Sequence, residues 1–336
     1  MFRVFGSNGP IGWTSEPLAS GPGVILGRKG AYRGVEFSRD PFFVIDTAYY
    51  VVPKTELDMR WLYYASKHHK LGEIDDGSPI PSTTRAAVYV KDLEVPPLTE
   101  QKAIASVLGS LDDKIELNRR MNKTLEALAQ SLFKSWFVDA TQFAFPKGWE
   151  VRGLDEIADF LNGLALQKFP PNGDDSLPVI KISQLRAGHT EGADRAGKNL
   201  PSQYIIENGD VLFSWSGSLL VDVWCGGRGA LNQHLFKVTS DKFPKWFYYL
   251  WTRHHLAAFQ NTAADKATTM GHIQRHHLSE AKVFVPTPSE LEKMGKQMSP
   301  LIEKLIANNL ESRTLAALRD ALLPKLLSGE LRVHAQ

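Results

Sequence analysis

The sequence predicts an α+β protein in which two globular domains alternate with two long helices. Residues 96–136, "PPLTEQKAIASVLGSLDDKIELNRRMNKTLEALAQSLFKSW", carry a long helical pattern, and a similar pattern returns near the end of the chain. Between them lie short β-branched and aromatic runs bounded by turn residues, such as "PFFVIDTAYYVV" and "NGDVLFSW", which favour strands. A chain of 336 residues is long enough for two domains of ordinary size.

The second half of the chain repeats the first in the same order. "IDTAYYVV" (45–52) matches "LNQHLFKV" (231–238), and "RWLYYASKHH" (60–69) then matches "KWFYYLWTRHH" (245–255). Residues 95–137 align with 285–327 without a gap. Two unrelated amphipathic helices share apolar positions by chance, but this order and polar matches such as Asn118 with Asn308 favour a true repeat.

The two copies differ at their beginnings. More than sixty residues separate Pro146 from Gly209, whereas twenty-two precede the matching Gly23. The first domain is therefore expected to lack about forty residues at its start, including a counterpart of "GWEVRGLDEIADFLNG".

Each long helix carries a coiled-coil repeat. In the first, the seam runs through Ile104, Leu108, Leu111, Ile115, Asn118, Asn122, Leu125, Ala129, Leu132 and Trp136. Packing of each helix on its own domain is the alternative. Asn118 and Asn308 lie mid-helix, so in an antiparallel pair each amide can satisfy the other and fix the register. Such a pair, about 60 Å long at 1.5 Å per residue, would be a spacer of set length.

Composition excludes several classes of protein. Apolar residues make up 43% and charged residues 23%, as in folded proteins. The single cysteine, Cys225, allows neither an internal disulfide nor a cysteine zinc site and fits a reducing cytosol. No signal peptide opens the chain and no long apolar run follows, so a cytoplasmic protein without a membrane partner is expected. The net charge of +2 neither demands nor excludes DNA.

Several segments resemble the specificity subunit of type I restriction-modification enzymes. They are the stretch 96–139, "GWEVRGLDEIADFLNG", "LLPKLLSGELRV", "VFGSNGPIGW" with "GRKGAYRGV", and "TTMGHIQRHHL". The resemblance implies two target recognition domains, each reading half of a split double-stranded DNA site. It also implies long helices that dock methyltransferase subunits, with separate restriction subunits. S-adenosylmethionine, ATP and Mg are then expected on those partners, and no cofactor on this chain. The short beginning departs from the family pattern.

The resemblance divides the chain into four parts. Residues 1–95 form a first target recognition domain, incomplete at its start, and 96–140 the central helix. Residues 141–285 form the second recognition domain, and 286–336 the C-terminal helix and tail.

Candidate DNA contacts in the first domain lie on short glycine-bounded loops. Arginine and lysine suit phosphate and guanine, and amides suit adenine. The candidates are Ser7, Asn8, Arg28, Lys29, Arg33, Thr83, Thr84 and Arg85. A basic hairpin tip such as "GRKGA" can also be a solvated turn, and the Thr-Thr-Arg stretch can equally be a helix cap with an ion-paired arginine.

The second domain presents different chemistry at the same location, because "SWSGS" (214–218) stands where "GRKGA" stands in the first. Different half-sites are expected. The candidates are Ser214, Ser216, Arg228, Gln233, Lys266, Thr268, Thr269, His272, Gln274 and Arg275.

No catalytic or metal constellation is expected. His272 and His276 lie four apart, with His254 and His255 nearby, but zinc needs further ligands and the first copy lacks the pair. The sequence contains no Gly-Lys-Ser/Thr phosphate loop, no dinucleotide fingerprint and no methyltransferase "NPPY" segment. We therefore expect a non-catalytic DNA-reading subunit. Alternatives are an assembly scaffold with a degenerate first domain, and a self-sufficient enzyme.

Overall fold

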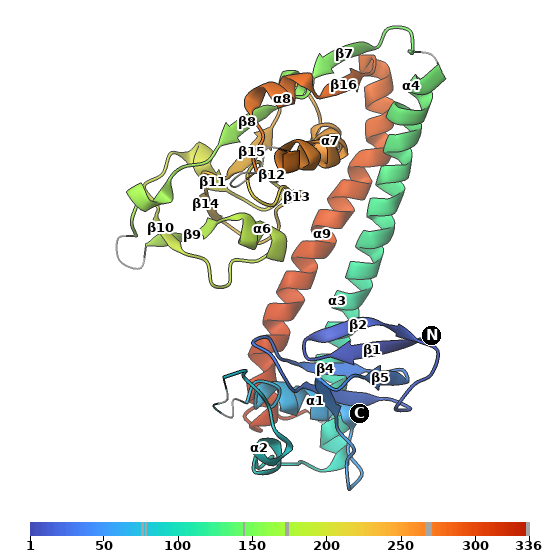
Figure 1. Cartoon of the computed structure of the whole chain (residues 1–336), viewed down its shortest axis with the longest axis vertical. Helices are drawn as coiled ribbons and strands as arrows, with labels where there is room; N and C mark the ends of the chain where they lie inside the picture. The colour runs from blue at the N-terminus through green and yellow to red at the C-terminus, as the bar shows by residue number, and fades with distance from the viewer. Residues whose placement is uncertain (75–76, 78, 144, 172–174, 266–270, 334–336) are drawn as a thin grey trace. The chain divides into compact units, whose positions relative to one another are not determined.

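The protein divides into two compact units, which share the two long helices. The computed structural model describes residues 1–74, 77, 79–143, 145–171, 175–265 and 271–333. Unit 1 contains Met1–Glu116 and Thr314–Gln336, and unit 2 contains Leu117–Arg313. Helices α3 (Leu98–Phe133) and α9 (Pro288–Leu327) each cross from one unit to the other (Figure 1). The boundary between the two units therefore falls in the middle of each long helix. The domain boundaries expected from the sequence fall at the ends of these helices.

Unit 1 contains two small sheets and two short helices. One sheet has the order β2-β1-β5 and the other β4-β3-β6. The strands are β1 (Phe2–Gly6), β2 (Gly9–Thr14), β3 (Gly23–Gly27), β4 (Val35–Ser38), β5 (Phe42–Val44) and β6 (Ala48–Tyr50). The helices are α1 (Met59–His68) and α2 (Arg85–Tyr89). Asp58 caps α1 by accepting the N–H groups of Arg60 and Trp61, which fixes where that helix begins.

The core of unit 1 joins the sheet to the long helices. Val24 and Leu26 of the buried strand β3 pack with Trp61 of α1, and Ile104 and Leu108 of α3 belong to the same cluster. Leu326 of α9 completes it. The long helices therefore serve as core elements of this unit as well as partners of each other.

Unit 2 has the same plan with additional elements. Its sheets have the orders β10-β9-β14-β11, β13-β12-β15-β8 and β16-β7. The strands are β7 (Glu150–Gly153), β8 (Asp159–Asn162), β9 (Ser176–Ile180), β10 (Arg195–Gly197), β11 (Ile205–Ile206), β12 (Val211–Ser214), β13 (Val221–Val223), β14 (Gly229–Leu231), β15 (Leu235–Thr239) and β16 (Lys282–Val285).

The helices of unit 2 differ widely in length and burial. They are α4 (Ala140–Phe143), α5 (Leu154–Ile157), α6 (Ile182–Ala187), α7 (Lys245–Asp265) and α8 (Arg275–Glu280), with 3-10 turns η2 (Leu166–Lys168) and η3 (Ser202–Tyr204). Helix α7 is apolar over most of its first turns, and Trp246, Phe247 and Trp251 are almost wholly buried. A helix that is apolar all round belongs inside a core.

Helix α3 continues as a single π-helical turn, η1 (Lys134–Asp139). This turn places Phe137 among Phe133, Trp246 and Trp251 in the core of unit 2.

Among the described residues, no helix combines the length and apolar character that crossing a bilayer requires.

The two long helices run antiparallel, as the sequence predicted. In unit 2, Asn118 of α3 reaches Asn308, Glu311 and Ser312 of α9. Asn122, one turn further along α3, reaches Leu305 and Asn309, so residue numbers rise on one helix as they fall on the other. In unit 1, Arg319 of α9 forms an ion pair of 2.6 Å with Asp112 of α3.

The asparagine pairing differs in detail from the expectation. The side-chain amide of Asn308 donates to Asn122 Oδ1 at 2.9 Å, and that of Asn118 donates to the Asn308 carbonyl oxygen and to Glu311. Asn118 and Asn308 do not pair amide to amide, because Asn122 lies one turn away on the same face of α3 and takes the Asn308 donor. Both predicted residues are fully buried in the helix seam.

Candidate DNA interface

The predicted loops of unit 1 lie side by side. Lys29 forms a β-bridge with Ser82, and the N–H of Thr83 donates to the carbonyl of Arg28 at 2.8 Å. The Ser7 hydroxyl donates to the Thr47 carbonyl at 2.6 Å and accepts the N–H of Lys29 at 3.3 Å. Three segments far apart in the sequence thus form one surface, which we call the unit 1 loop cluster: residues 7–8, 28–33 and 82–85.

The cationic groups of the unit 1 loop cluster are held in different ways. Arg28 and Arg85 stand over the ring of Tyr49, at 5.3 Å and 5.2 Å from its centroid, and Arg28 also donates to the Asp46 carbonyl. Such cation–π contacts orient a guanidinium while leaving N–H donors for a ligand. Lys29 and Asn8 are exposed. This arrangement suits an anionic partner.

Other predicted residues of unit 1 brace the loops. Arg33 donates to the main-chain carbonyls of Gly30, Glu73 and Ile74. Thr83 is fully buried and donates to the Ile74 carbonyl, while Thr84 caps helix α2 through the N–H of Ala87. The helix-cap interpretation of the Thr-Thr-Arg stretch therefore describes Thr84, and among the described residues the partner of Arg85 is the Tyr49 ring.

The corresponding loops of unit 2 meet in the same manner. Ser216 forms a β-bridge with His272, and the N–H of Ile273 donates to the Trp215 carbonyl at 3.0 Å. Ser216 Oγ lies 2.8 Å from His234 Nδ1, and Gln233 Nε2 lies 3.3 Å from His234 Nε2. We call residues 215–216, 233–234 and 272–275 the unit 2 loop cluster.

Sequence reasoning did not select the aromatic centre of the unit 2 loop cluster. Trp215 lies against the rings of His234 and His272, and its indole N–H donates to Asn162 at 2.8 Å. The signal for it was the tryptophan inside "SWSGS", which stands where a basic residue stands in the first copy. An indole ring, imidazole rings and an amide stand at this location in place of Arg28 and Lys29 of unit 1.

The other predicted residues of unit 2 fall into separate groups. Ser214 and Ser216 are buried, and the Ser214 hydroxyl donates to the Ser218 carbonyl at 2.6 Å, so these serines shape the loop. Arg228 lies outside the cluster in an ion pair with Glu207. Gln274 and Arg275 are exposed, and Arg275 contacts the Phe160 carbonyl and the Phe236 ring. Lys266, Thr268 and Thr269 lie outside the described residues.

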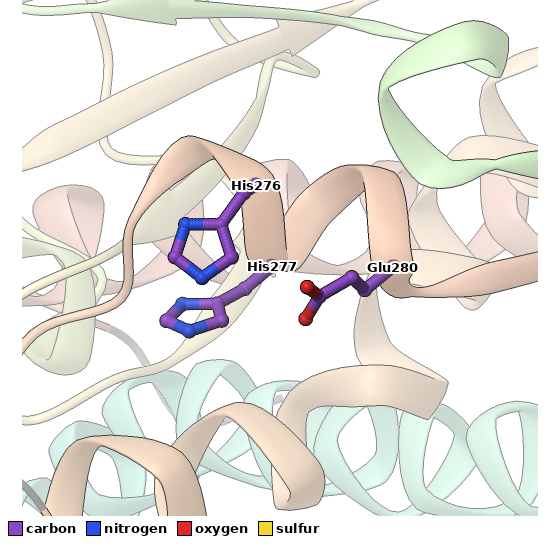
Figure 2. Close-up of side chains that lie close together, drawn as sticks. All are labelled: His276, His277 and Glu280. Carbon is purple, nitrogen blue, oxygen red and sulfur yellow. The ribbon is translucent and has the colours of Figure 1, made fainter.

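The histidines are arranged differently from the pair that the sequence suggested. Figure 2 shows His276 and His277 of α8 with their rings close together, tilted at 51° to each other, and the Glu280 carboxylate directed toward them. Their donor atoms lie within 4.8 Å of one another, although His277 Nδ1 accepts the N–H of Gln274. His255 instead contacts the Lys282 carbonyl and stacks on Trp251. Burial lowers the pKa of His255 to about 4.

A family model decides the identity. The model of the type I restriction modification DNA specificity domain matches this chain twice, over residues 15–127 and 146–315. The chain belongs to this family. The two matches coincide with the two copies of the repeat, and recognition of DNA sequence is the function of this specificity subunit.

The chain is also similar to named specificity subunits and to the solved structure of one such subunit. The type I restriction enzyme MjaIX specificity subunit of Methanocaldococcus jannaschii is 27% identical, over 93% of this chain and 78% of that protein. The HindI specificity subunit of Haemophilus influenzae is 23% identical, over 75% of this chain and 71% of that protein. The fold is similar to that of the type I restriction-modification S subunit from M. genitalium, with a TM-score of 0.61, 18% identity, and coverage of 97% and 88% of the two chains.

Proposed function

We propose that this specificity subunit reads a two-part site on double-stranded DNA, with one half-site assigned to each loop cluster. One observation carries the proposal. The same scaffold position presents Arg28 and Lys29 in unit 1, and Trp215 with His234 and His272 in unit 2. A shared framework with unlike side chains at one location is what two different half-sites require.

The side chains suggest a division of labour within each loop cluster. Lys29 is a flexible exposed cation suited to a phosphate, and Arg28 offers a planar donor fork suited to guanine or to a pair of phosphate oxygens. Gln233 and Gln274 offer amides, which match the donor and acceptor of adenine in the major groove. Phosphate contacts position a protein on the duplex, and base-edge contacts specify the sequence.

We further propose that the chain works without catalysis of its own, in a complex with methyltransferase and restriction subunits. S-adenosylmethionine, ATP and Mg would then be bound by those partners. The long helices are the proposed docking and spacing element, since their exposed faces lie outside the seam held by Asn118, Asn122 and Asn308. The absence of nucleotide-loop and methyltransferase motifs from the sequence supports this assignment.

A gel-shift assay with the methyltransferase subunits present tests the proposal. The complex should bind a duplex carrying the split motif at least about a thousand-fold more tightly than a scrambled duplex in the same salt. Binding that weakens with salt but ignores sequence would contradict it. Methylation or cleavage by the purified chain alone would show that the chain is catalytic.

One observation favours a second candidate, an assembly scaffold whose first domain no longer reads DNA. Within the described part of the chain, the unit 1 sheet ends at β6, whereas the matching sheet of unit 2 continues to a fourth strand, β8. A domain with fewer strands holds its loops less firmly. A motif in which only the half-site read by unit 2 matters would support the scaffold.

A further inference from the structure

The outer edge of strand β6 is open in unit 1. By the repeat, β6 corresponds to β15 of unit 2, because residues 45–52 align with 231–238. Strand β15 pairs with β12 on one side and with β8 on the other, through four residue pairs from Phe236–Asn162 to Thr239–Asp159. Strand β6 pairs with β3, and the sheet ends there. An open edge presents backbone donors and acceptors that can pair with another strand.

Side chains at this edge are more exposed than their counterparts in unit 2. The strand register places Tyr49, under the Arg85 guanidinium, at the position of Phe236 under Arg275, and Val51 at the position of Val238. Tyr49 and Val51 are partly exposed, whereas Phe236 is 6% and Val238 is 1% exposed. In unit 2 the covering element is β8, since Val238 pairs with Phe160 and Phe236 pairs with Asn162. The edge of β6 therefore keeps apolar side chains suited to a covering strand, and among the described residues such a strand, β8, lies on unit 2.

Residues 92–95 of unit 1 also lack a strand partner that the matching residues of unit 2 have, among the residues that the structure describes. Strand β16 of unit 2 pairs with β7, whereas the matching residues 92–95 form no strand in the structure. Val95 is 54% exposed, against 7% for the matching Val285. In unit 2, β7, α5 and β8 form one continuous segment that pairs with both places. Both exposed sites of unit 1 thus correspond to one strand–helix–strand segment of unit 2, residues 149–163.

A groove lies between the β6 edge and helix α2. It has a volume of about 420 Å³ and is lined by Tyr49, Tyr50, Val52, Arg85, Val88 and Tyr89, among others. In unit 2, Arg275 corresponds to Arg85 and donates to the carbonyl of Phe160 in β8 at 3.4 Å. Arg85 stands exposed over Tyr49. The groove therefore offers apolar walls together with a donor positioned for a strand carbonyl.

We propose that this groove binds a strand–helix–strand segment of a partner polypeptide, with the apolar pattern of residues 149–163. The first strand would pair with residues 92–95, the helix would cover Val88 and Tyr89, and the second strand would extend the β6 edge. A second copy of this chain is a poorer occupant. Its own segment is already paired with β16 and β15, and Leu154, Ile157 and Phe160 are buried there.

A peptide with the sequence of residues 146–164 tests this inference on the full chain. Hydrogen exchange followed by mass spectrometry should show saturable, at least about ten-fold slowing in two places, residues 48–52 and 91–95. A peptide carrying Leu154→Asp and Phe160→Asp should give no slowing, because both apolar anchors are removed. The 1:1 complex should be visible by native mass spectrometry.

Matched variants of the chain separate the groove from general stickiness. Val52→Asp and Tyr89→Asp should each abolish the slowing, whereas Ile11→Asp, at an exposed apolar position on strand β2, should leave it intact. The proposal is overturned if saturating peptide slows neither segment. It is also overturned if the peptide instead replaces residues 149–163 in unit 2, or if the chain alone shows protection of 48–52 that rises with its concentration, which would identify a second copy as the occupant.

Discussion

The two globular units contain the same strands in the same pairing but differ in what surrounds them. Strands β3, β4 and β6 of unit 1 are arranged as β12, β13 and β15 are in unit 2, and β1 pairs with β5 in parallel as β9 does with β14. Unit 2 adds β7, α5 and β8 around that framework. The framework is therefore the same beside this border segment in unit 2 and without a described counterpart of it in unit 1, while the side chains at the loop tips differ.

The largest contrast is expected between a buried valine of β15, Val238, and an exposed valine just after β6, Val52. Val238→Asp places a carboxylate in a buried position between β12 and β8 and should lower the free energy of unfolding by about 3 kcal/mol or more. Val52→Asp lies at the exposed edge of β6 and should change it by no more than about 0.5 kcal/mol. Urea unfolding followed by tryptophan fluorescence measures both. Equal losses would contradict the difference between the two edges.

A smaller loss is expected in the helix seam. Asn308→Ala removes the donor to Asn122 Oδ1 and leaves that oxygen buried without it, which should cost about 1–3 kcal/mol. The exposed Lys123→Ala on the same helix as Asn122 is the control and should be nearly neutral. A neutral result for Asn308→Ala in urea unfolding would show that the seam does not depend on this bond.

The pH dependence of the stability of unit 2 should reveal the lowered pKa of His255. Burial, with a smaller contribution from His254, lowers its pKa to about 4 from an ordinary value of 6.5. The unfolded chain then binds more protons between these values, so stability should fall by about 1 kcal/mol as pH drops from 6.5 to 4, allowing for partial exposure. His255→Gln should flatten this slope, whereas His189→Gln on an exposed loop should not.

The smallest effect on thermal stability is expected from added metal ions. His276, His277 and Glu280 lie close together (Figure 2), but His277 Nδ1 already accepts the backbone N–H of Gln274. Zinc added at ten-fold excess should leave the thermal midpoint of the chain unchanged, and His276→Ala should behave like the parent. A rise in the midpoint that His276→Ala removes would instead establish a metal site on α8.

The sequence predicted the repeat, the long helices and their antiparallel direction, because heptad periodicity and polar matches such as Asn118 with Asn308 can be read directly from the order of residues. It did not predict that the Asn308 amide would donate to Asn122 and not to Asn118, because these two residues lie one turn apart on the same face of α3 and the sequence does not set the register of α9 to within one turn. Nor did it separate contact from bracing in the loops. Ser214 and Thr83 are polar residues beside glycines and turn residues, and only the three-dimensional pairing of 28–30 with 81–83, and of 215–217 with 271–273, shows that they are buried.

Mapping of methylated bases shows whether each loop cluster reads its own half-site. Cells carrying the full restriction-modification system with Arg28→Ala and Lys29→Ala are compared with the parent by single-molecule sequencing of the genome. One half of the split motif should become degenerate or be lost, while the other half and the spacing between the halves stay the same. An unchanged motif, or a change in both halves together, would contradict the assignment of one half-site to each loop cluster.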